Sequence, residues 1–347
     1  MVVSTTRVIA ALALLALDLG GCREQRSPVP IKTTSLFDGG QPGDRDVRLD
    51  PERESGTAAT GGDGAAGREP FTPREAPEAW AIWPMPNAPL PGLPNHQKYD
   101  TATVGVVVDQ VTGLMWQRDV ANTFMPFDDA QRECSRLKVA GHEDWRLPSR
   151  IELVSLLDMS RTQPSINLGA FPGAPSEWFW TSSVAEGQPS AAWYVYFYAG
   201  YPKTDEKGNR FSVRCVRDAE PRARPARHYD TRAGEVRDLA TGLTWQRAAP
   251  DKTLALDAAR AYCKQLTVAG RKGWRLPTEG ELFTLVDEHA AIGPMIDGAA
   301  FPKTPSEPFW SSSFFAGGPA MAWYVAFDHG DGRYGFPTEK YRVRCVY

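Results

Sequence analysis

The chain has 347 residues and a formal net charge of −3 at pH 7. This length suggests about two domains. The near-neutral charge balance excludes a globally basic surface of the kind that binds nucleic acid, so no nucleic-acid partner is expected.

The first 22 residues resemble a bacterial lipoprotein signal peptide. Arg7 supplies a positive start, and the apolar run that follows is too short to span a bilayer. Residues 19–22 (LGGC) resemble a lipobox, so we expect acylation of Cys22 and a membrane partner held through that anchor. The expected location is the cell envelope, as an outer-membrane lipoprotein facing the periplasm or the cell surface. The alternative is an ordinary signal peptide with an incidental cysteine.

Residues 23–95 are rich in proline, glycine and charge, and poor in aliphatic side chains. Such a segment buries too little apolar surface to offset its ordering entropy, which predicts a disordered tether. The stretch at 79–94 (AWAIWPMPNAPLPGLP) differs, because it combines prolines with Trp80 and Trp83. We expect it to pack as an extended arm on the domain that follows.

The rest of the chain is one unit used twice. TGLMWQR at 112–118 returns as TGLTWQR at 241–247, and DWRLPSRIEL at 144–153 returns as GWRLPTEGEL at 273–282. FWTSS, AWYVYF and VRCV also return, and the offset changes from 129 to 130 residues between the second and third motifs. A period of this length is a whole domain. We expect repeat 1 at 96–217, a linker at 218–229 and repeat 2 at 230–347.

Each repeat predicts a hairpin, two helices and then several strands. In repeat 1 the hairpin turns near Thr112-Gly113, the first helix covers 127–139, and strands cover 178–182, 192–198 and 211–216. The first helix of repeat 2 is expected at 256–268. Ser149 and Thr278 each precede a glutamate by three residues, which predicts two capping boxes. This order indicates an α+β fold with antiparallel pairing.

Four cysteines remain after the lipobox cysteine is set aside, two at matching positions in each repeat. An even count in an exported chain favours disulfides, and we expect the pairs Cys134–Cys215 and Cys263–Cys345. The alternative is a metal site or reactive thiols, although neither repeat offers a CxxC motif or a histidine at ligand spacing.

The ordered set of motifs resembles the Lcl C-terminal domain family, and both repeats are similar to it nearly end to end. The resemblance implies two tandem C-type-lectin-like domains, a fold shared with the formylglycine-generating enzyme group. Each would have a twisted antiparallel sheet, two helices and one disulfide from the first helix to the last strand. The sugar-binding and reactive-cysteine motifs of those relatives are missing here, so the resemblance implies surface binding and no specific activity.

No catalytic residue and no cofactor are predicted. None of the five histidines recurs at the matching position of the other repeat, and a duplicated nucleophile would need a base in each copy. Asp328 and Asp331 are weak candidates for a calcium site, with a plain surface turn as the alternative. The aromatic residues that differ between the repeats are the candidate ligand-binding residues: Tyr196, Tyr198, Tyr201, Phe314, Phe315 and Tyr334.

The sequence therefore predicts a non-catalytic envelope protein for adhesion, which presents two lectin-like modules to a glycan or to an envelope protein. Carbohydrate binding is the expectation for the glycan case. One alternative is a structural subunit of an envelope or surface assembly. Another is an enzyme with one active and one degenerate repeat. The sequence does not give the oligomeric state or predict whether the two repeats pack together.

Overall fold

The computed structural model describes residues 80–121, 123–221 and 227–347. Repeat 1 contains β1 (Tyr99–Asp100), β2 (Val106–Asp109), β3 (Leu114–Gln117), α1 (Phe127–Arg136), α2 (Arg150–Val154), β4 (Trp178–Val184), β5 (Ala191–Tyr196), β6 (Tyr201–Glu206) and β7 (Val216–Asp218). Repeat 2 contains β8 (Tyr229–Arg232), β9 (Glu235–Asp238), β10 (Thr244–Gln246), α3 (Leu256–Gln265), α4 (Glu279–Phe283), β11 (Pro308–Phe314), β12 (Ala322–Ala326) and β13 (Asp331–Gly335).

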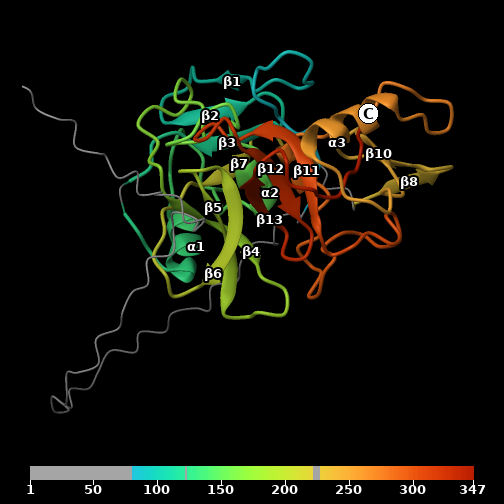
Figure 1. The fold of residues 1–347 in the computed structure, drawn as a ribbon. Helices are drawn as coiled ribbons and strands as arrows, with labels where there is room; N and C mark the ends of the chain where they lie inside the picture. The colour runs from blue at the N-terminus through green and yellow to red at the C-terminus, as the bar shows by residue number, and fades with distance from the viewer. Residues whose placement is uncertain (1–79, 122, 222–226) are drawn as a thin grey trace, which may run out of the picture. The chain divides into compact units, whose positions relative to one another are not determined.

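Each repeat builds two small sheets, and every ladder in them is antiparallel (Figure 1). Repeat 1 has a four-stranded sheet in the order β1-β2-β3-β7 and a three-stranded sheet in the order β4-β5-β6. Repeat 2 has the sheets β10-β9-β8 and β11-β12-β13. The prediction of a tandem α+β protein with antiparallel pairing is confirmed at this level.

Strand positions near the end of each repeat differ from the prediction. The expected strand at 211–216 is wrong in position, because β7 begins only at Val216. Phe211 and Ser212 instead make single bridges to Met125 and Phe179. The strands β6 and β13 follow β5 and β12, where the sequence indicated loops. Their polar residues, prolines and glycines concealed this strand character.

The helices begin where the capping signals place them. Ser149 accepts a hydrogen bond from the backbone N–H of Glu152, and Thr278 does the same for Glu281, so both capping boxes are confirmed. The same glutamates pair with Arg146 and Arg275 at 2.6 Å. Both helices are one short turn of five residues. The first helix of each repeat has ten residues and is shorter than predicted, because Leu137 and Leu266 turn to extended backbone.

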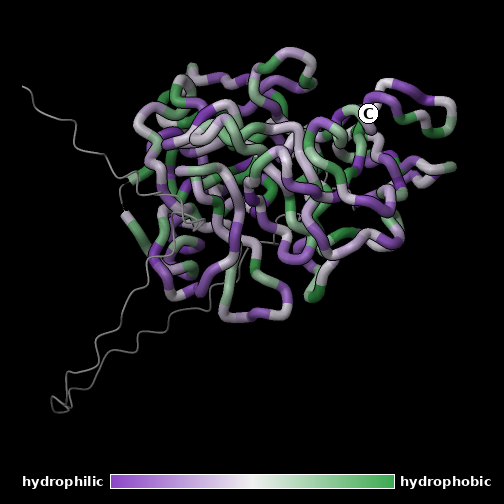
Figure 2. Tube along the Cα trace, in the orientation of Figure 1, coloured by the Kyte–Doolittle hydropathy of each residue, from purple (hydrophilic) through white to green (hydrophobic). Residues whose placement is uncertain are grey.

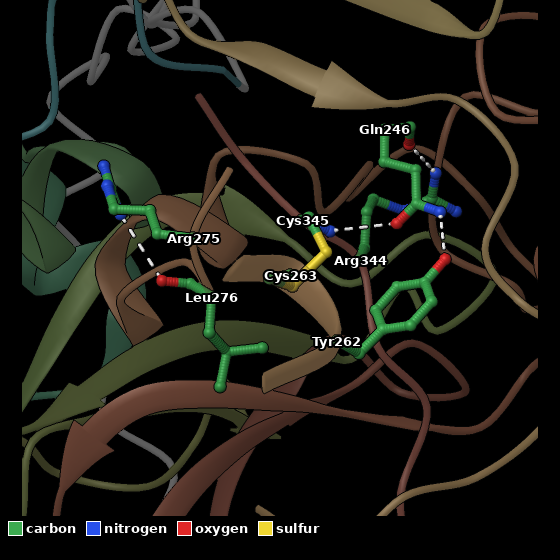
Figure 3. The surroundings of a disulfide bond; sticks show 7 residues. All are labelled: Gln246, Tyr262, Cys263, Arg275, Leu276, Arg344 and Cys345. Carbon is green, nitrogen blue, oxygen red and sulfur yellow. Dashed lines mark hydrogen bonds between the residues drawn. A yellow bond between two sulfur atoms is a disulfide. The ribbon is translucent and has the colours of Figure 1, made fainter. Parts of the chain in front are cut away.

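The disulfides Cys134–Cys215 and Cys263–Cys345 are both present, which confirms the predicted pairing. Each joins the first helix to a segment beside the last bridge or strand of its repeat. In repeat 2, Cys345 N–H donates to the side chain of Gln246, and that amide donates to the Tyr262 hydroxyl at 2.8 Å (Figure 3). Gln246 also offers its carbonyl to the buried Arg344 at 2.7 Å.

Arg214 and Arg344 are equivalent buried arginines, and each lies over two phenylalanine rings of its own repeat. Burial lowers the pKa of Arg214 to about 10 and the pKa of Arg344 to about 9. The guanidinium of each donates to two backbone carbonyls at 2.6–2.8 Å. These recurring polar residues therefore hold the fold together.

One hydrophobic core cluster extends through both repeats. It includes Ile151 and Phe171 of repeat 1 together with Leu282 and Phe301 of repeat 2. Two further clusters surround the disulfides, one in each repeat. The two domains therefore pack against each other through the faces that carry α2 and α4.

The arm packs in the core cluster shared by both repeats, where the sequence predicted packing on repeat 1, and its backbone passes through bends and a turn instead of running extended throughout. Gln97, just beyond the arm, donates to the Leu157 carbonyl of repeat 1 at 3.0 Å. In repeat 2, the Thr278 hydroxyl donates to the side chain of Asn87 at 2.9 Å. Residues 81–88 are thus mostly buried and residues 89–95 mostly exposed, whereas the remainder of the predicted tether lies outside the described residues. The predicted signal peptide and Cys22 also lie outside them.

Among the described helices, none combines the length and the apolar character needed to cross a membrane. Hydrophobic and hydrophilic stretches alternate along the chain (Figure 2).

Candidate functional site

The two repeats meet at α2 and α4. Equivalent positions of the two repeats lie on two sides of this contact, but they carry different residues. On the first side, Arg150 at the start of α2 donates from Nε to Glu288 Oε2 at 2.8 Å. The Ser183 hydroxyl donates to the other carboxylate oxygen at 2.7 Å. All three side chains are buried, and Arg150 also lies over the Trp193 ring at 5.3 Å. This side is closed by an ion pair between repeats.

On the second side the equivalent positions hold different chemistry. Glu279 takes the place of Arg150, and Met159 takes the place of Glu288. The Glu279 backbone donates to the Ser313 hydroxyl at 3.1 Å, but both of its carboxylate oxygens are buried without a hydrogen-bond partner. Burial raises the pKa of this carboxyl well above its usual range. The ion pair therefore has no counterpart here.

The loops that carry these positions also differ in length. Asp158 and Asp287 each donate a backbone N–H to the residue after a proline, which fixes the two loops as equivalent. The loop from Asp287 to Pro294 is one residue longer than the loop from Asp158 to Pro164. This is the residue that changes the repeat offset from 129 to 130. Met159 and Glu288 directly follow the two aspartates at the start of these loops, so the presence of the ion pair on one side depends on residue identity at this position.

The second side is hollowed into a groove of about 460 Å³, which we call the interrepeat groove. Its walls come from residues 85–93 of the arm, residues 154–160 of repeat 1, and residues 278–280 and 312–319 of repeat 2. The lining side chains belong to Met, Pro, Leu, Val, Ala and Phe residues, with Asn87, Thr278 and three serines as the polar groups. None of the lining residues is charged.

The structure places the six candidate ligand-binding aromatics in two settings. Phe314 and Phe315 line the interrepeat groove, and Phe314 is exposed while Phe315 is buried. The other four lie in a cluster that joins the repeats around Trp323, namely Tyr196, Tyr198, Tyr201 and Tyr334. Tyr334 stacks on Phe315 at 4.2 Å, which links the two settings. Tyr198 lies in the turn between β5 and β6, and the others lie on strands or directly beside a strand end. Their role in ligand binding stays a prediction.

The two weak calcium candidates, Asp328 and Asp331, have different partners. Asp331 is buried at the start of β13, where its Oδ2 accepts from Arg333 at 3.0 Å. Burial raises the pKa of Asp331. Asp328 pairs with His329 at 2.8 Å. Within residues 80–121, 123–221 and 227–347, no group of three or more acidic, histidine or cysteine side chains is arranged to hold a metal ion.

Sequence reasoning missed the residues that shape the groove. The arm was expected only as packing, and Met159 and Ser160 drew no attention. One signal was available, since the motif DWRLPSRIEL carries Arg150 where GWRLPTEGEL carries Glu279. A charge reversal inside a shared buried helix indicates that the two copies occupy unequal surroundings.

Glu279 allows a test of this inequality through pH. In the folded chain its pKa is raised, so above the ordinary carboxyl pKa the folded state binds more protons than the unfolded state. Its contribution to stability therefore falls as pH rises. We expect the free energy of unfolding of Glu279→Gln to equal that of the parent near pH 4 and to be about 1–3 kcal/mol larger than that of the parent at pH 8. Urea unfolding at both pH values measures this, and an equal difference at both would contradict it.

Comparison with known families gives one assignment for both repeats. The model of the Lcl C-terminal domain matches residues 105–217 and again residues 234–347. Each match contains one disulfide and one copy of the paired helices. A search of curated proteins finds no match.

Proposed function

Because the chain belongs to the Lcl C-terminal domain family and carries that domain twice, we propose that it is a non-catalytic binding protein of the bacterial cell envelope. It is anchored through an acyl group on Cys22, and its two domains share the C-type-lectin-like fold. Its ligand is a segment of another envelope protein. The interrepeat groove carries this proposal, because it is a concave, largely apolar surface with a few dispersed polar groups.

The recurring polar residues support binding over catalysis. Glu152 and Glu281 serve the capping boxes and pair with arginines, and Arg214 and Arg344 support backbone carbonyls. What the two copies share therefore maintains the fold. What differs between them gathers at the groove, where Phe314 and Phe315 replace Val184 and Ala185 of repeat 1. Divergent loops on equal scaffolds are the usual location of binding function.

The test uses a photo-crosslinking phenylalanine analogue in the full chain, produced in the envelope of its own host. One variant carries it at Phe314, and the matched control carries it at Val184, since the two side chains are 43% and 45% exposed. We expect a defined protein crosslinked from position 314 and not from position 184. Equal crosslinking at both positions would contradict the proposal. The proposal would also be contradicted if the chain bound to a glycan array and the Phe314→Ser variant bound to it equally well.

A further inference from the structure

We propose that the interrepeat groove binds a short, uncharged, proline-containing peptide segment in the extended polyproline II conformation. This inference rests on the proposed function and names the ligand of the same groove. The charge, backbone hydrogen bonding, composition and size of the groove each point to this class of ligand.

The uncharged lining disfavours charged ligands. None of the side chains that line the groove is ionised, and the nearest unpaired acid, Glu279, faces Gly332 and Phe283 in the interior. A charged ligand would lose hydration on entering and would find no counter-charge, which costs several kcal/mol. A sulfated glycan or an acidic peptide is therefore disfavoured, and an uncharged segment is the complementary partner.

Backbone hydrogen bonding excludes the addition of a strand. At the end of β11 the backbone donors are already engaged: Ser312 N–H bonds the Pro277 carbonyl at 2.7 Å, and Phe315 N–H bonds the Met321 carbonyl at 3.0 Å. Ser313 N–H bonds the Ser311 hydroxyl at 3.2 Å. A strand that docks needs a free row of such groups. Polyproline II has no internal hydrogen bonds and keeps its backbone solvated, which an open groove permits.

Composition favours proline in the ligand. Phe314 and Phe315 give the groove an aromatic wall, and proline-rich segments dock in aromatic-lined grooves. The arm contributes two prolines to the lining, Pro86 and Pro91, although its backbone passes through bends and a turn at residues 91–92. Ser312 provides a hydroxyl for a carbonyl of the ligand, whereas Ser160 already donates to Asp158 and the Asn87 amide already donates to the Pro94 carbonyl.

Size limits the ligand to a few residues. A volume of about 460 Å³ lies within the range of small-ligand pockets.

The experiment measures fluorescence polarisation of the labelled octapeptide PPLPALPP with the full chain. A charged version, PPKPAEPP, and labelled palmitate are the comparison probes. The groove variant is Leu90→Asp, which places a charge in the wall. Its matched control is Leu239→Asp, outside the groove, since Leu90 is 46% and Leu239 51% exposed. We expect the neutral peptide to bind, the dissociation constant to rise at least tenfold in Leu90→Asp, and Leu239→Asp to bind like the parent.

Three outcomes would overturn the inference: equal binding of the charged peptide, tighter binding of palmitate at the same site, or equal loss in both aspartate variants. Circular dichroism of each variant shows whether it has folded. If the neutral peptide fails to bind while position 314 still crosslinks a protein in the envelope, the ligand class is wrong and the proposed function stands. If both fail, the groove is not a binding site.

Discussion

Replacement of Arg150 by methionine is expected to destabilise the folded chain by about 3–5 kcal/mol, because it leaves the Glu288 carboxylate buried without its charged partner. Of the two side chains that donate to this carboxylate, only the Ser183 hydroxyl would remain. Urea unfolding of the full chain at pH 7 measures the loss. At the equivalent position we expect stabilisation instead, because Glu279→Gln removes a buried carboxyl group that has no partner.

The double variant Arg150→Met, Glu288→Met is the decisive companion. It removes both charges, and at position 288 it introduces the methionine that the equivalent position 159 already has. Apolar replacement of a whole buried pair is often neutral or stabilising, so most of the loss should be recovered. Arg132→Met breaks an exposed pair with Asp129 and should cost less than about 1 kcal/mol. A double variant as unstable as the single one would mean that Arg150 acts by its packing on Trp193 rather than by its charge.

The features that the sequence predicted well are local or duplicated. A capping box needs only a hydroxyl and a glutamate three residues apart, so Ser149 and Thr278 mark their helices without any tertiary knowledge. The disulfides followed from counting two cysteines in each copy. Each of these signals stands in one short stretch of chain or repeats at a fixed offset.

The packing of the two repeats could not be predicted in the same way. Ile151 and Leu282 are apolar residues that any core would accept, and nothing in their spacing says that one cluster will include both repeats. The interrepeat groove needs four segments that are separated in the chain. Tyr201 and Tyr334 differ between the copies because they lie where the repeats face each other, a cause that a sequence comparison alone does not reveal.

The second large effect is expected from the disulfides. Each bridge spans 81 or 82 residues, for which the chain-entropy model gives about 4–5 kcal/mol, and native bridges typically give 2–5. Alanine is the suitable replacement, since all four cysteines are buried and a serine hydroxyl would lack a partner. We expect Cys134→Ala with Cys215→Ala, and Cys263→Ala with Cys345→Ala, to lower stability by similar amounts.

The shape of the unfolding curve shows whether the two repeats unfold together or separately. Because one core cluster and the Arg150–Glu288 pair join the repeats, loss of either bridge should shift a single cooperative transition of residues 80–347. Repeats that fold separately would instead give two transitions, with only the mutated repeat displaced. Reductant provides the control. It should destabilise the parent, and it should not change the stability of a variant that lacks both disulfides. A single shifted transition would establish that the groove is held by both domains together, so that damage in either one reaches the binding surface.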